Sequence, residues 1–393
     1  MIESLLNKSH TTVSLKDCCE EIAQRIDNPA ESGFERFVGL EHLETGETSI
    51  RNWGSTEDVT SSMKLFKTGD VIVARRNVYL RRAARAHFDG VCSGDGIVLR
   101  SNPKAFLPDL LPFLLNTDAF WEYVTSQADG TMSKRITVKR LLSYTFVLPP
   151  LEEQRRIAEV LQACQRASES LVLSAERASL VEYAFLRDAF GTRYGQSDET
   201  LYLEPLENVA EIRTGLAKGR KADSSTIETP YLRVANVQDG HLDLDEIKQI
   251  VVEADRVARY SLKTGDVLMT EGGDLDKLGR GTVWQGEIRE CLHQNHVFAV
   301  RTDTTRLDPW YLAAVARSPY GRSFFLQNAK RSSNLASVNK TQLSGFQVPL
   351  MSLDAQRHWL AEYHAIRSRE ADLRSRAAQT SKLAAAVLRK AMQ

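Results

Sequence analysis

The sequence predicts a mixed α/β protein made of two tandem domains that arose by internal duplication, each followed by one long helix. Three observations lead to this fold class: two long amphipathic segments share one heptad spacing, related motifs introduce both, and the order of strand, turn and helix patterns recurs before the second. Such self-similarity is typical of duplicated architectures. We expect domains at residues 1–150 and 191–350, and spacer helices at 151–190 and 351–393.

The first long segment, Leu151 to Phe190, has the residue spacing of a coiled-coil seam. Alternate steps of three and four residues bring side chains to one face of a helix. The residues expected to pack between the helices are Ile157, Cys164, Leu171, Ala178 and Phe185. We expect the alternate seam positions to be filled by Val160, Ala167, Ser174 and Val181.

The second long segment, Leu353 to Met392, repeats this spine 202 residues later. Both segments follow a proline and begin with related sequence motifs, LEEQR and LDAQR. One amphipathic helix alone would indicate ordinary core packing, whereas two copies in register favour a tandem duplication. The second set of expected packing residues is Trp359, Ile366, Leu373, Thr380 and Val387.

The composition excludes several classes of protein. The 393 residues include 51 basic and 51 acidic side chains, so the chain is not polybasic and any nucleic-acid contact depends on local patches. The five cysteines form neither a CxxC pair nor a zinc spacing, which indicates reduced thiols. Because the sequence has neither a secretory leader nor a run of about 18 apolar residues, we expect a cytoplasmic protein without a membrane partner.

The first domain is expected to begin with a short amphipathic helix that carries Cys18, Ile22 and Ile26 on one side. A period of two and turn residues then indicate strands. We expect strands at 71–74 and 96–99 and a helical stretch at 107–125.

The second domain repeats these patterns in the same order. Lys263 to Asp266 matches Lys67 to Asp70 letter for letter, and Leu307 to Phe325 corresponds to the helical stretch of the first domain. The loops of the two domains differ in length and sequence, while the order of strands and helices is the same. This divergence favours one task performed on two different targets.

Basic side chains gather in loops at corresponding places of the two domains. Planar guanidinium groups bind phosphate oxygens and read guanine edges, so such loops can position and discriminate on a duplex. A solvated surface hairpin is the alternative for either cluster alone, but the recurrence favours nucleic-acid binding. The candidates in the first domain are Arg75, Arg76, Tyr79, Arg81, Arg82, Lys134, Arg135 and Lys139. Those in the second are Arg213, Lys218, Arg220, Lys221, Lys277, Arg280, Lys330, Arg331, Asn334 and Lys340.

Enzymatic interpretations find little support in the sequence. Residues 218–220 lack the GxxxxGK[ST] phosphate loop, and Glu246-Ile247-Lys248 is a nuclease-like triplet without an upstream acid. Cys291, His293 and His296 lack a fourth zinc ligand. No adenine-methyltransferase tetrapeptide occurs. We therefore predict no catalytic residue and no metal site.

The combined pattern resembles the DNA specificity subunit of type I restriction and modification systems. The resemblance rests on the two exit motifs, VLPPLEEQRRIAEVL and VPLMSLDAQRHWLAEY, and on Gly69 to Arg100, which is similar to a stretch common in that family's recognition domains. Leu262 to Gly281 looks like its partner in the second half. The second exit departs from the family pattern, since Ala355 replaces the second glutamate and Met351-Ser352 lengthens it.

This resemblance implies two target recognition domains separated by two long antiparallel coiled-coil helices, with each domain reading one half of a split site on double-stranded DNA. It implies two adenine methyltransferase (modification) subunits that bind S-adenosylmethionine, a restriction and translocase subunit, and no cofactor or catalysis in this chain. The seam from Ile157 to Phe185 is roughly 42 Å long at about 1.5 Å per residue. That length is about 12 base pairs at roughly 3.4 Å each, so it could set the gap between two half-sites.

Two other functions remain open: a duplicated coiled-coil adaptor that binds protein or RNA, and a nuclease that uses Glu246 and Lys248. If each domain reads its own half-site, alanine in the first domain should weaken only one half-site and alanine in the second domain only the other. The arginines to test are Arg75, Arg81 and Arg82 in the first, and Arg220, Arg280 and Arg331 in the second.

Overall fold

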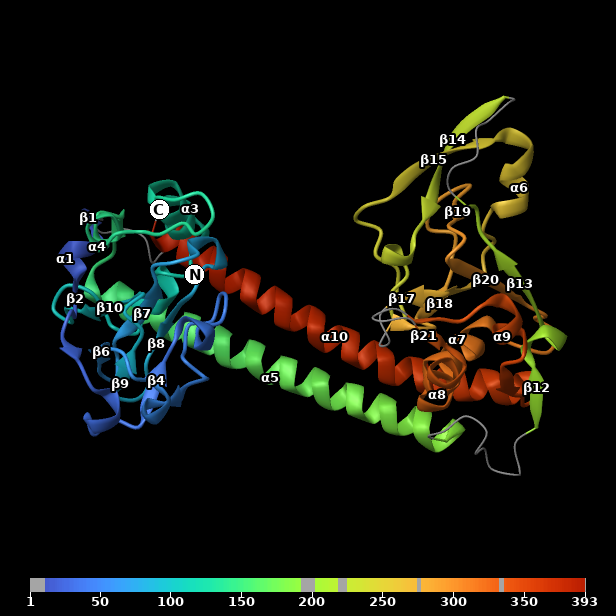
Figure 1. Cartoon of the computed structure of the whole chain (residues 1–393), viewed down its shortest axis with the longest axis horizontal. Coiled ribbons are helices and arrows are strands. Elements are labelled where there is room, and N and C mark those ends of the chain that lie inside the picture. Colours follow the sequence, from blue (N-terminus) through green and yellow to red (C-terminus); the bar gives the residue numbers. More distant parts are fainter. Residues whose placement is uncertain (1–10, 192–201, 218–224, 274–276, 332–335, 393) are drawn as a thin grey trace. The chain divides into compact units, whose positions relative to one another are not determined.

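The chain folds into two compact units, each containing one globular domain and part of both long helices (Figure 1). Unit 1 comprises residues 1–172 and 374–393, and unit 2 comprises residues 173–373. The domains, outside the long helices, are hereafter domain 1 and domain 2. The computed structural model describes residues 11–191, 202–217, 225–273, 277–331 and 336–392.

Domain 1 is built mainly from short strands. Their sheet orders are β1-β11, β2-β10-β7-β8 and β3-β6-β9-β4-β5. The strands are β1 Thr11–Ser14, β2 Cys19–Glu21, β3 Arg25–Ile26, β4 Arg36–Val38, β5 Gly54–Ser55, β6 Met63–Phe66, β7 Val71–Ala74, β8 Ala83–Arg85, β9 Gly90–Cys92, β10 Gly96–Ser101 and β11 Thr145–Leu148. The helices are α1 Leu15–Cys18, α2 Leu111–Leu114, α3 Asp118–Gln127 and α4 Val138–Leu142, followed by the long α5 Leu151–Phe190.

Domain 2 has the same kinds of element. Its sheet orders are β12-β23, β13-β20-β16-β18, β15-β14-β19 and β17-β22-β21. The strands are β12 Leu203–Pro205, β13 Ala210–Thr214, β14 Thr226–Leu232, β15 Lys248–Glu253, β16 Val267–Thr270, β17 Gly272–Gly273, β18 Gly281–Val283, β19 Leu292–His293, β20 Val297–Thr302, β21 Lys330–Arg331, β22 Ala336–Ser337 and β23 Gln347–Pro349. The helices are α6 Val257–Tyr260, α7 Pro309–Arg317, α8 Pro319–Asn328 and α9 Lys340–Ser344, followed by the long α10 Leu353–Met392.

The two domains share one topology, as the repeated sequence patterns predict. The four-stranded sheets β2-β10-β7-β8 and β13-β20-β16-β18 are antiparallel and use corresponding strands. A short parallel pairing also recurs, between β4 and β9 in domain 1 and between β14 and β19 in domain 2. The mixed α/β fold class and the duplication are confirmed.

The central strands are continuously apolar because they separate two cores. In β7, Val71 and Val73 belong to the core beneath the helices, whereas Ile72 and Ala74 belong to a second core on the other side of the sheet. Alternate side chains of a strand point to opposite faces, so a strand covered on both faces has no polar position. β16 divides its side chains between two cores in the same way.

The repeated KTGD motif forms a turn closed by a buried carboxylate. Asp70 is 1 % exposed, accepts a hydrogen bond from Lys67 N at 2.8 Å, and receives two from the Arg100 guanidinium at 2.7 Å. In domain 2, Asp266 is bonded in the same way to the backbone N–H of Lys263 and to the Arg301 guanidinium, with each distance 2.8 Å. The literal match between the two sequences is therefore structural.

Helices α5 and α10 begin and end as the sequence predicts, and they pack together. In unit 1, the Ser168 and Ser381 hydroxyls lie 3.1 Å apart. In unit 2, Ser179 donates a hydrogen bond to Glu370 at 2.8 Å, and Phe185 stacks on Trp359 with ring centroids 5.1 Å apart. Within unit 2 the partner in α10 moves back along the chain as α5 advances, so the two helices are antiparallel. Among the described residues, no helix is long and apolar enough to cross a membrane.

The heptad spine has the predicted positions, but the alternate seam positions were predicted one residue too early. The ten spine residues are buried or partly buried. Val160 and Val181, however, are 45 % and 55 % exposed, and Ala167 is also exposed, whereas Ser174 is partly buried. Each inward-facing alternate residue of α5 follows a spine residue by four positions rather than three. The inward-facing residues at the alternate positions are Leu161, Ser168, Ala175 and Glu182, of which Ser168 is partly buried.

Two further expectations were wrong in detail. The first helix of domain 1 is only four residues long, and Cys19 already belongs to β2, whose backbone pairs with β10. Pairing with a sheet edge outweighs the weak helical periodicity there. The helical stretch at 107–125 is two helices, and its counterpart at 307–325 likewise divides at Ser318, which caps α8.

A buried glutamine fixes the start of each long helix. Gln154 and Gln356 are 1 % and 0 % exposed. The Gln356 amide donates at 2.8 Å to two carbonyl oxygens, those of Arg306 and Met351, and accepts at 2.8 Å from Asp308 N. Gln154 binds the corresponding backbone groups in unit 1, with Leu107 N donating to its side-chain oxygen at 2.8 Å. The glutamine of each LxxQR motif therefore connects the start of a long helix to the domain that precedes it.

Replacing Gln356 by alanine should destabilise unit 2. Three backbone groups lose their partner in a buried position, which costs about 2–3 kcal/mol. Thermal or urea unfolding measures this effect. The control is Gln327→Ala, because Gln327 is exposed and, within the described residues, its side chain bonds to Ser323 in the same helix. Equal stability of the two variants would contradict this role of Gln356.

Candidate nucleic-acid interface

In domain 1 the two basic clusters of the sequence meet in space. The loop after β7 and the loop before α4 are joined by a hydrogen bond from Ile136 N to Arg75 O at 2.9 Å. Arg76 Nε donates to Ser133 Oγ at 3.0 Å, and the Ser133 hydroxyl donates to Asn77 at 2.8 Å. These contacts make one composite surface from segments about 60 residues apart in the sequence.

Arg76 and Arg135 share one carboxylate. Asp95 lies 2.9 Å from Arg135 and 3.8 Å from Arg76, while the two arginine side chains remain 46 % and 50 % exposed. A carboxylate between two half-exposed arginines orients their guanidinium groups while part of each side chain stays in contact with water. Guanidinium groups held in this way can accept a phosphate or a base edge.

Tyr79 projects from a short turn with unusual backbone on both sides. Asn77 and Arg81 have φ values of 54° and 51°, in the left-handed region that residues other than glycine seldom adopt. The turn between them leaves Tyr79 59 % exposed. An exposed aromatic ring beside arginines is suited to stacking on a base or a sugar.

The side chains of two other arginines of the first cluster are already bonded within domain 1. Arg81 pairs with Asp118 at 2.5 Å, and Arg82 donates to Leu40 O at 2.6 Å. Burial lowers the pKa of Arg82 despite the opposing influence of Glu41 and Tyr79. Arg75 has a buried Nε that finds no hydrogen-bond partner among the described residues. Arg81 and Arg82 therefore support the loop, while Lys134 is partly exposed and Lys139 is exposed on α4.

Domain 2 joins the corresponding two loops. Val338 N donates to Glu271 O at 2.8 Å, which matches the bond between Ile136 and Arg75. In the small sheet β17-β22-β21, the middle strand β22 pairs with the glycines after β16 on one side and with the strand of Lys330 on the other. The two loops that form the composite surface of domain 1 therefore have joined counterparts in domain 2.

The predicted residues of domain 2 are only partly described. Lys218, Arg220, Lys221 and Asn334 lie outside the described residues, and Arg331 is described only by its backbone in β21. Lys277, Lys330 and Lys340 are exposed, and Arg280 is partly buried. Arg213 donates to Arg259 O at 2.6 Å and pairs with Glu211 at 3.3 Å.

The structure describes the surroundings of the two enzyme-like motifs that include Glu246 and Cys291. Glu246 is exposed, and hydrogen bonding from Arg233, with the charge of Lys248, lowers its pKa. Burial raises the pKa of Cys291 to about 12, so this thiol is protonated at neutral pH. Within the described ranges, no group of three or more His, Cys, Asp or Glu residues could hold a metal ion.

His293 should make unit 2 sensitive to acid. Burial lowers its pKa, although its Nδ1–H donates to Val297 O at 2.7 Å. An unfolded histidine titrates near pH 6.5 and binds the proton that the buried ring excludes, so stability is full above that pH and is lost as pH falls below it. Unfolding of His293→Asn between pH 7 and 5 should depend less on pH than that of the wild type. His358→Asn, at an exposed position of α10, is the control, and equal slopes for all three proteins would contradict this expectation.

Sequence reasoning missed the polar partners that organise the surface of domain 1. Asn77, Asp95 and Ser133 carry no motif of their own, and they come from three separate segments. Only their pairing in space identifies them. A left-handed Asn77 between arginines is a weak sequence indication, since asparagine is the non-glycine residue that most readily adopts that backbone.

Comparisons with known proteins match the first part of the chain to a family model and the chain to several specificity subunits. Residues 10–172 match the model of the type I restriction modification DNA specificity domain. The chain is 26 % identical to the putative type I restriction enzyme MjaX specificity subunit of Methanocaldococcus jannaschii over 42 % of this chain and 39 % of that protein. It is 22 % identical to the type I restriction enzyme EcoKI specificity subunit of Escherichia coli over 72 % and 62 % of the two chains. The chain thus matches less than two thirds of the length of these relatives.

Solved structures show the same fold across the whole chain. A chain from a type I R-M system, studied for complex assembly and conformational transition, superposes with a TM-score of 0.60 at 22 % identity, covering 98 % of each chain. The type I restriction-modification S subunit from M. genitalium gives a TM-score of 0.55 at 14 % identity, covering 99 % of this chain and 97 % of that one. Residues 10–172 thus match a type I restriction modification DNA specificity domain, and the whole chain is similar in fold to a type I restriction-modification S subunit.

Proposed function

We propose that this chain gives a type I restriction-modification complex its DNA sequence specificity, with each domain reading one half of a bipartite site on double-stranded DNA. The observation that carries the proposal is the composite basic surface of domain 1, whose two loops have joined counterparts in domain 2. In domain 1 it presents Arg76, Tyr79 and Arg135, and in domain 2 the corresponding loops carry Lys277 and Lys330. Two domains with the same topology but different loop side chains could recognise two different half-sites.

The same proposal assigns the chemistry to partner subunits. Two adenine methyltransferase subunits would bind S-adenosylmethionine and dock on this chain, and a restriction and translocase subunit would complete the complex. A methyl acceptor has to leave the base stack to reach an active site, so base flipping would belong to the methyltransferase. This chain would bind and orient the DNA without making or breaking bonds.

A net charge of zero fits this division of tasks. A neutral subunit binds random DNA weakly, because nonspecific affinity depends on the number of phosphates that basic side chains neutralise. The local basic loops then act mainly where they meet base edges. Partner subunits could supply further phosphate contacts.

Selection from a random pool of duplexes tests the proposal. The chain, purified in complex with the proposed adenine methyltransferase subunits, should enrich duplexes that share two short motifs at a constant separation. RNA and random duplex should compete only at low salt, where nonspecific binding is strong. Enrichment of no motif, together with equal binding of RNA, would favour the duplicated coiled-coil adaptor instead.

A further inference from the structure

A buried carboxylate on α5 connects both long helices to domain 2. Glu182 is 3 % exposed and accepts a hydrogen bond from the Tyr363 hydroxyl at 2.8 Å. Arg317 Nε lies 3.1 Å and Arg367 Nε 3.7 Å from the same oxygen. Glu182 therefore contacts α10 through two side chains and the end of α7 through a third.

The two arginines extend this cluster to a turn of domain 2. Arg317 pairs with Asp239 at 3.3 Å and donates to Asp239 O at 3.0 Å. Arg367 donates to Gly240 O at 3.3 Å. The Glu182 cluster, defined here as Glu182, Asp239, Arg317, Tyr363 and Arg367, thus holds a turn, a short helix and both long helices in one set of polar contacts.

Buried charges favour one geometry more than they favour folding itself. An ion pair out of water gains little net stability, but removing one member leaves the other uncompensated and is costly. Burial by itself lowers the pKa of Arg317, yet Asp239 and Glu182 raise it overall, so this guanidinium stays charged. A domain shifted along the helices would separate these charges, so the cluster penalises displacement.

Unit 1 has the same framework without this cluster. Helix positions correspond through the 202-residue offset, and Arg317 corresponds to Asn116 because each precedes the residue that caps the next helix. In the order Glu182, Tyr363, Arg367 and Arg317, the counterparts are Ala384, Leu161, Gln165 and Asn116.

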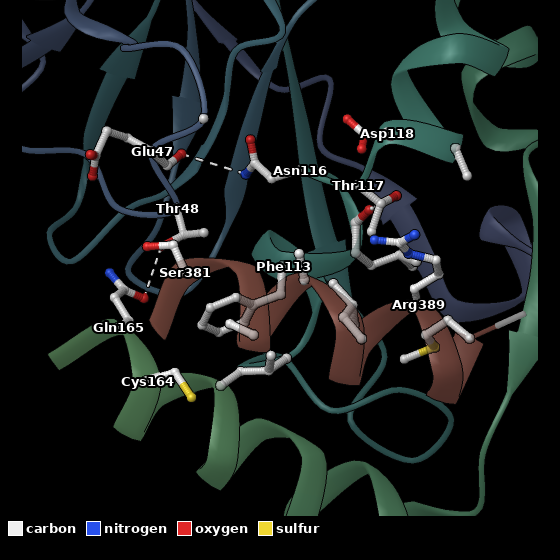
Figure 2. Close-up of a pocket in the computed structure, with 18 of the residues that line it drawn as sticks. Glu47, Thr48, Phe113, Asn116, Thr117, Asp118, Cys164, Gln165, Ser381 and Arg389 are labelled. Atoms are coloured by element: carbon white, nitrogen blue, oxygen red, sulfur yellow. Dashed lines mark hydrogen bonds between the residues drawn. The ribbon is translucent and has the colours of Figure 1, made fainter. Parts of the chain in front are cut away.

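These four smaller or uncharged side chains line a pocket of about 630 Å³ in unit 1. Figure 2 shows Asn116 and Gln165 at this pocket, with the Thr48 hydroxyl bonded to the Gln165 side-chain oxygen at 3.0 Å. The nearby ion pair of Arg51 with Glu169 has side chains 50 % and 44 % exposed. Domain 1 is therefore joined to its helices at this place by exposed polar contacts, where domain 2 has a buried charge cluster.

We propose that Glu182 is a positioning residue that fixes the orientation of domain 2 on its helices, and that this fixed orientation lets the complex distinguish the correct gap between half-sites from gaps one base pair longer or shorter. The proposal rests on the proposed function in DNA recognition. Glu182 acts through Arg317, Arg367 and Tyr363. Its role does not require it to touch DNA.

The test measures methylation rates on duplexes that carry both half-sites at the selected gap and at gaps one base pair shorter and longer. Each protein is the full chain in complex with its methyltransferase. We expect Glu182→Gln to lower the preference for the correct gap on the order of tenfold, because small misplacements of binding groups have effects of that size or larger. Reading of the half-site sequences at the correct gap should stay intact.

Two further variants keep the test decisive if Glu182→Gln folds poorly. Tyr363→Phe removes only the hydroxyl donor and keeps the ring stacked on Trp359, so it should broaden the gap preference by a smaller factor. Glu169→Gln removes the exposed ion pair of unit 1 on the same helix and should leave the gap preference unchanged.

The outcomes are distinct. Broader gap preference in Glu182→Gln and Tyr363→Phe, but not in Glu169→Gln, supports the proposal. Equal loss of rate at every gap, or an unchanged preference in both cluster variants, overturns it. Failure of the wild-type complex to methylate any two-part duplex would instead contradict the proposed function.

Discussion

Replacing both Arg76 and Arg135 by alanine should weaken recognition of one half-site and leave the other unchanged. Their guanidinium groups are half exposed and are held together by Asp95. A good contact between a guanidinium and a base edge contributes about 1–3 kcal/mol of discrimination. Together the two losses should amount to about 2 kcal/mol or more, which is roughly a 30-fold change in affinity.

The measurement is the methylation rate on duplexes with one base pair changed in either half-site. The double variant should no longer distinguish changes in the half-site read by domain 1, while it still rejects changes in the other. Arg51→Ala is the matched control, because Arg51 is an equally exposed arginine of unit 1 that pairs with Glu169. Equal loss of discrimination in both half-sites would show that the domains do not read separately.

Replacing Asp266 by asparagine should strongly destabilise unit 2. The change removes the charge that pairs with Arg301, whose side chain is only 24 % exposed, and weakens the cap on Lys263 N. Breaking a buried pair costs about 3–5 kcal/mol when both groups are out of water. With Arg301 partly hydrated, we expect about 2–4 kcal/mol.

Asp70→Asn should have a smaller effect on unit 1, since its partner Arg100 is 37 % exposed. Urea unfolding, followed by fluorescence and by hydrogen exchange in each unit, separates the two effects. Asp354→Asn, at a side chain 96 % exposed on α10, is the control. A loss of stability in the unit that was not altered would contradict the assignment of each KTGD turn to its own core.

The features predicted well from sequence are those set by local periodicity or literal repetition. Both long helices begin and end where the heptad spine and the proline exits place them, and the KTGD repeat marks equivalent turns. The prediction of the alternate seam positions was wrong because valines lie three residues after two of the spine residues. The inward-facing positions lie four residues after the spine and include charged residues such as Glu182, which the sequence alone suggests to be exposed. When a helix buries a charged residue in an ion pair, the positions of its apolar residues alone do not show which side of the helix faces the interior.

The candidate surface could be predicted only in part, for a related reason. Sequence pattern locates arginines, but it does not show which are already bonded within the domain. Arg81 and Arg82 resemble Arg76 in the sequence, yet Asp118 and the Leu40 carbonyl bind them. Likewise, the role of Gln154 and Gln356 depends on backbone groups about 50 residues away, which no local pattern reveals.

Single-molecule methylation sequencing of DNA from cells that contain this chain and its methyltransferase tests two-part reading most directly. We expect methylated adenines in a motif of two specific parts with a constant gap. In cells with the Arg76 and Arg135 double variant, one part should become degenerate while the other part and the gap persist. A single uninterrupted motif, or simultaneous degeneration of both parts, would contradict recognition by two separate domains.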